Sequence, residues 1–141
     1  MGLIVDRRTL LETFGALALQ AATATAQNQN EPSRGVVFQH DLPDLNMQGW
    51  SVTAVEVKYG PGAGSAAHRH PGITLAYVLE GEVVSKVGDG PEKTYTVGQM
   101  FLETPNELHG VSRNASSTKP ARLLAMLLAE KGKQLTTPAA V

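Results

Sequence analysis

The residues best suited to chemistry in this chain are the three histidines His68, His70 and His109. His68 and His70 are separated by one residue, so on a strand both side chains point to the same face. His109 follows later, on another expected strand. Neutral imidazole is a good ligand for iron, manganese, nickel, zinc and copper. Three converging histidines therefore predict a transition-metal site, whereas His40, in a polar loop, is expected at the surface.

Glu103 is the carboxylate best placed to join them, because it lies six residues before His109 on the segment that leads into the same turn. It could be a fourth ligand, a hydrogen-bond partner of a histidine, or a general base near the metal. It could equally point outward into solvent, because the segment 100–105 (MFLETP) has no readable alternation. Both possibilities stay open at this point.

The elements that must position these residues are short runs of strand character separated by turns rich in Gly and Pro. In residues 50–59, Val55, Val57 and Tyr59 alternate with Val52 and Ala54. Such a series is typical of an all-β sandwich or barrel. Residues 121–132 could instead form a helix, since Leu, Ala and Met favour one, but their place in a β-rich chain favours a strand. The expected strands are 35–39, 50–59, 65–70, 74–79, 82–87, 94–97, 100–103, 109–112 and 122–129.

The spacing of these residues resembles the first motif of the cupins, single-domain jelly-roll barrels of the RmlC-like type. That motif reads G-x5-HxH-x3,4-E-x6-G, and Gly62, His68, His70, Thr74 and Gly81 fit every spacing. The difference is Thr74, which stands where the family has a glutamate.

The second cupin motif is matched less closely. Gly98 lies eleven residues before His109, as the family requires, but Asn106 stands where the motif has a glycine. Asn tolerates the left-handed backbone conformation better than most residues, so the turn can survive. Arg113 holds the position of the motif's final Asn, with Asn114 beside it. The resemblance covers residues 36–129 and implies a double-stranded β-helix.

The resemblance also implies that His68, His70 and His109 are metal ligands, with Fe(II) favoured and Zn, Mn and Ni as alternatives. Without the carboxylate a divalent site would carry a charge of +2, which favours anionic ligands. This arrangement is similar to three-His cupins of the thiol dioxygenase and β-diketone dioxygenase kinds. Thr74 is a poor ligand but could hydrogen-bond a metal-bound water, so Thr74 and Glu103 are the candidate catalytic residues.

Three functions fit these observations. The favoured one is a metal-dependent oxidoreductase of dioxygenase type acting on an enolic, phenolic or polyketide-like substrate. The second is a metal-dependent isomerase, lyase or cyclase in which the metal is a Lewis acid. The third is a non-catalytic exported cupin that binds a small ligand. The small molecule would occupy an apolar pocket, which we expect to be lined by Ala76, Val78, Met100, Phe101 and Leu102. Resemblance alone suggests a homodimer.

Composition excludes several other classes. The 141 residues suffice for one domain with one core. A net charge of −1 without a basic block argues against nucleic acid. No stretch reaches the roughly 20 apolar residues of a membrane span. The absence of cysteine excludes disulfides, Cys-ligated zinc and thiol nucleophiles.

The N-terminal segment has the pattern of an export signal. Arg7 and Arg8 precede a mildly apolar stretch that ends in small residues up to Ala26, and the pair resembles a bacterial Tat signal. A eukaryotic secretory signal and a retained amphipathic helix are alternatives. Export would make the protein periplasmic or secreted; otherwise it is cytoplasmic. The expected organisation is a signal peptide at 1–26, a linker at 27–34, a cupin domain at 35–130 and a flexible tail at 131–141.

Overall fold

The computed structural model of the chain describes residues 35–139. The expected signal peptide at 1–26 and linker at 27–34 lie outside the described residues, as do the last two residues of the chain. Nothing in the described part is a helix long and apolar enough to cross a membrane.

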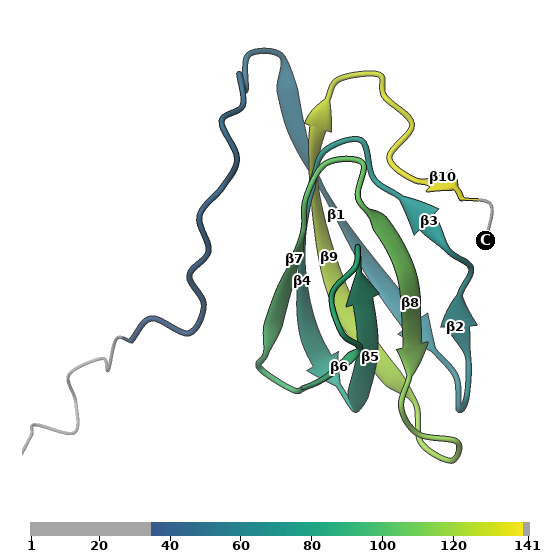
Figure 1. The fold of residues 1–141 in the computed structure, drawn as a ribbon. Helices are drawn as coiled ribbons and strands as arrows, with labels where there is room; N and C mark the ends of the chain where they lie inside the picture. Colours follow the sequence, from purple (N-terminus) through teal and green to yellow (C-terminus); the bar gives the residue numbers. More distant parts are fainter. Residues whose placement is uncertain (1–34, 140–141) are drawn as a thin grey trace, which may run out of the picture. The chain divides into compact units, whose positions relative to one another are not determined.

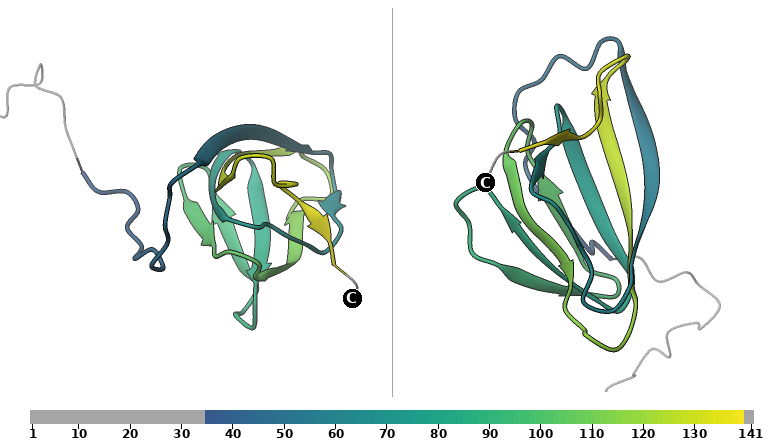
Figure 2. Two further views of the ribbon diagram at one scale, coloured as in Figure 1. Left: turned by 90° about the horizontal axis from the view of Figure 1, so that it is seen from above. Right: turned by 90° about the vertical axis from the view of Figure 1, so that its right-hand side faces the viewer.

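The described residues form two antiparallel sheets that curve around a common interior (Figure 1 and Figure 2). The first sheet has the order β1-β9-β4-β7, and the second has the order β10-β3-β8-β5-β6, with β2 also paired to β8. The expectation of an all-β jelly-roll barrel is confirmed. The strands are β1 (Trp50–Tyr59), β2 (Gly64–Ser65), β3 (His68–Arg69), β4 (Ile73–Glu80), β5 (Glu82–Val87), β6 (Lys93–Thr96), β7 (Met100–Glu103), β8 (Leu108–Asn114), β9 (Ala121–Glu130) and β10 (Thr137–Pro138).

Strand β9 shows why residues 121–132 do not form a helix. It pairs along its length with β1 on one side and with β4 on the other. Its burial alternates strictly from Ala121 to Ala129, with buried residues at every second position. Two full ladders of backbone hydrogen bonds outweigh an intrinsic preference of a few tenths of a kcal/mol per residue for a helix.

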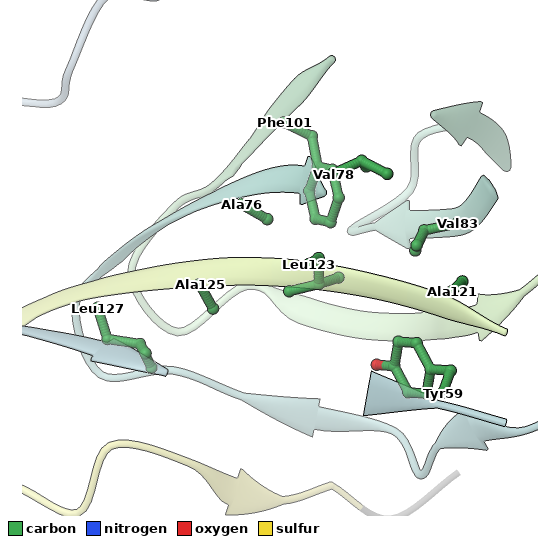
Figure 3. Packing of buried hydrophobic residues seen from close by; sticks show 9 residues of the cluster. All are labelled: Tyr59, Ala76, Val78, Val83, Phe101, Ala121, Leu123, Ala125 and Leu127. Carbon is green, nitrogen blue, oxygen red and sulfur yellow. The ribbon is translucent and has the colours of Figure 1, made fainter. Parts of the chain in front are cut away.

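The hydrophobic core lies between the inner faces of the two sheets (Figure 3). Each fully buried Val or Leu side chain stabilises the fold by roughly 1.5–3 kcal/mol through removal of apolar surface from water. The expectation that Met100 and Leu102 line the interior is wrong, because β7 turns Phe101 and Glu103 inward and leaves these two half-buried on the other face. The core cluster comprises Tyr59, Ala76, Val78, Val83, Phe101, Ala121, Leu123, Ala125 and Leu127.

Two segments near the ends of the described chain differ from the sequence-based expectation. Residues 35–39 form no strand, and Val36 and Val37 are exposed. Apolar character alone does not make a strand where no neighbouring strand takes up the backbone hydrogen bonds. At the other end, where only a loose tail was expected, Thr137 and Pro138 form β10 against β3.

Candidate metal centre

Four ligand-type side chains gather at one end of the barrel interior. The ligand atoms of His68, His70, Glu103 and His109 all lie within 4.8 Å of one another. The ring of His68 is 4.9 Å from that of His70 and 4.9 Å from that of His109. The arrangement that the HxH spacing predicted is present, and Glu103 belongs to the same group. These four side chains line a cavity in the barrel, and Thr74 lines it too.

The turn after His70 carries the chain from one sheet to the other, because β3 and β4 belong to different sheets. Gly72 makes this crossing possible. A Cβ atom at this position would lie 1.9 Å from the carbonyl oxygen of Leu128, so any other residue would force the chain away from β9. The close approach brings Thr74, at the start of β4, next to the histidine group.

The turn between β7 and β8 holds Glu103 and His109 next to His68 and His70. Asn106 has a φ of 61°, so the expected left-handed Asn is confirmed. Its backbone N–H donates to the carbonyl oxygen of His70 over 2.7 Å. The exposed Arg69 guanidinium donates to the carbonyl oxygen of Asn106 over 2.6 Å. Arg69 thus points away from the site and ties the turn down.

Glu103 points into the barrel, so the outward, solvated orientation left open by the sequence is wrong. It pairs directly across the ladder with Thr74, and its side chain is 5% exposed. Carboxylate oxygen Oε2 lies 2.9 Å from Nδ1 of His109 and 3.5 Å from Nε2 of His70. A carboxylate is therefore present in the histidine group, although position 74 does not provide it.

Hydrogen bonds to backbone carbonyls fix the rings of His68 and His70. Nδ1 of His68 lies 2.7 Å from the carbonyl oxygen of Ala66, and Nδ1 of His70 lies 2.7 Å from that of Leu135. A carbonyl oxygen only accepts, so both rings donate from Nδ1, and in the neutral ring this leaves the lone pair on Nε2. Burial also lowers the pKa of His68, which favours its neutral, ligand-competent form.

His109 is oriented in the opposite sense. Its Nε2 lies 2.9 Å from the hydroxyl of Ser85, so Nδ1 is the nitrogen that faces Glu103. Each of the three imidazoles thus has one nitrogen held by the protein and the other directed at the shared space. Outer hydrogen bonds of this kind are typical of histidines that bind metals.

Three buried polar atoms in or next to this group have no hydrogen-bond partner among the described residues: Thr74 Oγ1, Glu103 Oε2 and His109 Nδ1. The last two are 2.9 Å apart but are not aligned as a hydrogen bond. Leaving such an atom unpaired costs about 1–3 kcal/mol. A cation between Glu103 and the histidine nitrogens would satisfy the charged and lone-pair atoms together, so the donor set fits a divalent transition metal.

His68, His70, Glu103 and His109, here called the metal group, form the polar end of a cavity of about 610 Å³. Its wall is mostly apolar and comes from the inner faces of β1, β4, β7 and β9. A volume of this size suits a small molecule. On these four strands the aliphatic and phenylalanine lining residues are Val55, Val57, Ala76, Phe101, Leu123, Ala125 and Leu127.

Residues 134–138, here called the C-terminal strap, cross the mouth of this cavity and were not predicted as part of it. Leu135 lines the cavity, packs against the core and gives its carbonyl to His70. β10 holds the strap in place by pairing Pro138 with His68. Because Leu135 acts on His70 through its backbone, no residue-type pattern could have identified it. Ser85 did leave a signal, as the polar member of the series Val83, Ser85 and Val87.

A β-bulge decides which residue takes the place of the second motif's final Asn. β5 pairs with β8 so that Gly110 is skipped, which shifts the alternation of β8 by one residue. Asn114 is therefore the buried residue, and Arg113 is exposed. The Asn114 amide donates to the carbonyl oxygens of Gly60 over 3.0 Å and Lys119 over 2.7 Å.

Comparison with known proteins gives matches at the level of family and fold. A family described as "Cupin domain" matches residues 55–127. No curated protein matches the chain. The solved structure of the DMSP lyase DddQ from Ruegeria pomeroyi DSS-3 matches with a TM-score of 0.55 and 18% identity, over 63% of this chain and 43% of the lyase.

Two further solved structures cover more of the chain. An uncharacterized protein with a double-stranded β-helix domain from Klebsiella pneumoniae matches with a TM-score of 0.54 and 21% identity, over 80% of this chain and 88% of that one. An oxalate oxidase in complex with glycolate matches with a TM-score of 0.52 and 15% identity, over 77% of this chain and 66% of the oxidase.

These likenesses establish the fold and the family. At 15% to 21% identity the structural matches show the shared architecture alone. The chain spans less than half the length of the two DMSP lyases it matches, 43% and 45%. The matched residues 55–127 contain all four members of the metal group and make up more than half of the 141 residues. The chain therefore belongs to the cupin domain family.

Proposed function

We propose that this chain is a metal-dependent enzyme that acts on a small, oxygen-bearing molecule. The proposed ligands are His68, His70, His109 and Glu103. The observation that carries the proposal is the pair of buried, unpartnered atoms Glu103 Oε2 and His109 Nδ1, set among imidazoles whose other nitrogens are already bonded. A group without a metal role would be expected to satisfy these atoms within the protein.

The charge of the group bears on what it would bind. Three neutral imidazoles and the Glu103 carboxylate give a divalent site a charge of +1, which attracts an anionic oxygen inside a largely apolar cavity. A bound metal would supply Lewis acidity and, if it is iron(II), reactivity toward O2. The unpaired Thr74 hydroxyl, directly across from Glu103, is placed to donate to an oxygen of the substrate or of a water.

For the reaction, our first proposal is an Fe(II)-dependent oxidoreductase of dioxygenase type, with an enolic, phenolic or polyketide-like substrate. An enolate or phenolate would place its oxygen at the positive group and its apolar body against the walls around Phe101 and Leu127. Zinc, manganese and nickel remain the alternative metals.

A second candidate is a metal-dependent lyase, isomerase or cyclase that works without O2. The inward carboxylate of Glu103 supports this candidate. The dioxygenase was favoured because position 74 lacks a carboxylate, and with Glu103 the group is no longer a three-His site. The similarity to a DMSP lyase is compatible with it but extends to the fold only. The non-catalytic alternative is a cupin that binds its ligand and does not turn it over.

Elemental analysis of protein purified without a histidine tag, beside a His68→Ala/His109→Ala variant, tests the proposal. We expect nearly one equivalent of metal in the natural protein and almost none in the variant. Loaded protein is then given 1,3-diketones and phenols with and without O2. Turnover that needs O2 supports the dioxygenase, and turnover without O2 supports the second candidate. Failure to bind metal even after reconstitution overturns the enzyme proposal.

We also propose export through the N-terminal segment, which lies outside the described residues. Expressed in a bacterium with a Tat system, the mature protein should begin at Gln27. An Arg7→Lys/Arg8→Lys variant should stay in the cytoplasm at full length. Sequencing of the N-terminus after cell fractionation measures both, and an unprocessed natural protein in the cytoplasm contradicts the proposal.

A further inference from the structure

A second polar group lies in the same cavity, apart from the metal group. The hydroxyl of Tyr59 is 2.9 Å from that of Ser65 and 2.8 Å from that of Ser112. All three residues line the cavity. Tyr59 is 7% exposed and Ser112 is 4% exposed, whereas Ser65 is exposed. These residues, here called the hydroxyl trio, link the cavity interior to the surface.

The contacts within the hydroxyl trio do not use all of its hydrogen-bond donors. Three hydroxyls offer three hydrogens, but the two contacts within the trio use only two of them. No other hydrogen bond reaches these three oxygens from residues 35–139. Water at the exposed Ser65 can receive the spare hydrogen or can donate to Ser65. In the second case the chain of hydrogen bonds runs inward, and Ser112 presents a free donor to the cavity.

The hydroxyl trio and the metal group stand a short distance apart in the fold. The strand ladder pairs Ser65 with Ser112, and the next part of the same ladder pairs His68 with His109. The two pairs are three positions apart along the chain, so at about 3.3 Å per residue they lie at most about 10 Å apart. Figure 3 shows Tyr59 and Leu127 at opposite ends of the apolar cluster. Leu127 pairs with Thr74 and so marks the metal end.

We infer that the hydroxyl trio is a second polar subsite, which sets the class of ligand that the cavity takes. That class is a small molecule with an anionic oxygen at one end, an apolar body a few carbons long, and an oxygen acceptor at the other end. The anionic oxygen faces the metal group, the body lies against the walls between the two groups, and the acceptor receives the hydrogen of Ser112. This inference rests on the proposed metal site for its anionic end.

Matched pairs of simple acids test the inference. Pentanoate and 4-oxopentanoate differ by one keto oxygen, as do hexanoate and 5-oxohexanoate. Their binding is measured by calorimetry on protein brought to one equivalent of Zn²⁺, with metal content determined for every sample. We expect at least one oxo acid to bind about tenfold more tightly than its partner, the gain of one buried hydrogen bond.

Two serine variants supply the comparison. Ser112→Ala should reduce the ratio to about one while leaving metal content and alkanoate affinity unchanged. Ser51→Ala makes the same chemical change at an exposed residue of β1 outside the trio, and should keep the ratio within about twofold. If Ser112→Ala fails to fold, Tyr59→Phe should at least halve the ratio, because Ser112 loses the donor behind it.

The outcomes separate the two proposals. Metal-loaded protein that binds each oxo acid no better than its alkanoate, or that binds neither, overturns the inference and leaves the metal site standing. An equal loss of the ratio in Ser51→Ala and Ser112→Ala also overturns it, because the effect would then not be specific to the trio. Protein that takes up no metal overturns both proposals.

Discussion

Thr74 and Glu103 are direct cross-strand partners, buried side by side on β4 and β7. Residues directly opposite each other in an antiparallel ladder have Cβ atoms about 4.5–5.5 Å apart. A carboxylate on either residue can therefore reach the same space. The first cupin motif places its glutamate at position 74, and this chain has a carboxylate on the neighbouring strand instead.

The first prediction is that the carboxylate can be transferred from position 103 to position 74, where the cupin motif has it. Glu103→Thr should lower metal affinity by more than about 100-fold, beyond the effect of losing an outer hydrogen-bond partner. The double variant Thr74→Glu/Glu103→Thr should recover to within about tenfold of the natural protein, because donors and total volume are kept. Competition with a chelator measures both affinities. A double variant no better than Glu103→Thr contradicts the exchange.

The second prediction concerns Thr74→Glu alone, which places two carboxylates opposite each other. Without metal their repulsion and the added volume should cost about 1–3 kcal/mol, a fall in Tm of roughly 4 °C or more. Metal should restore most of this loss, because it binds the folded state. Thermal unfolding with and without Zn²⁺ measures the change. Thr74→Gln, which adds volume without charge, is the control, and an equal effect in both would contradict the repulsion.

The sequence was sufficient to identify the barrel and the histidines. Alternation is clear in β1, where it placed Val55, Val57 and Tyr59 on one face, and the structure turns this face toward the cavity. The HxH spacing placed His68 and His70 on one face. The orientation of Glu103 could not be predicted, because β7 carries apolar side chains on both faces. When neither face is polar, the sequence does not show which one points inward.

Other parts of the site depend on relations that no local pattern records. The bulge at Gly110 moves Asn114 inward in place of Arg113, and it exists only because β5 pairs with β8 in that register. The carbonyl of Leu135 bonds to His70 from a segment of ordinary composition. Both are long-range contacts, and both were missed.

The third prediction tests the outer partner of His109. Ser85→Ala removes the hydroxyl near Nε2, so the ring loses the contact that turns Nδ1 toward Glu103. Metal affinity should fall by about 10- to 100-fold, as is usual for such partners. Ser51→Ala, on the exposed part of β1, should change nothing. Chelator competition compares the two variants, and an unchanged affinity in Ser85→Ala would show that the hydroxyl does not position the ring.

The fourth prediction is that the C-terminal strap supports the metal site through its backbone. Deleting residues 134–141 removes the carbonyl that holds His70, so metal affinity should fall by about 10- to 100-fold. Leu135→Ala keeps that carbonyl and removes only the side chain. It should lower Tm through lost packing while metal affinity stays within about threefold. If the point variant loses metal as strongly as the deletion, the side chain, not the carbonyl, is what matters.

The last prediction concerns the outer face of the first sheet, where a row of apolar residues crosses all four strands. The row consists of Ala54, Met126, Leu75 and Leu102, paired in that order. A continuous apolar row on the outer face of a sheet is typical of a surface that another surface covers. We therefore propose that two copies of the chain pair through this face.

The natural protein should accordingly run as a dimer in light scattering at micromolar concentration. Met126→Lys places a charge at the centre of the row and should give a monomer, because an unpaired charge is costly to bury in an interface. Val97→Lys adds the same charge at an exposed apolar residue in the turn between β6 and β7, and it should stay dimeric. A natural protein that is monomeric under these conditions contradicts the pairing, and a Val97→Lys monomer would place the interface elsewhere.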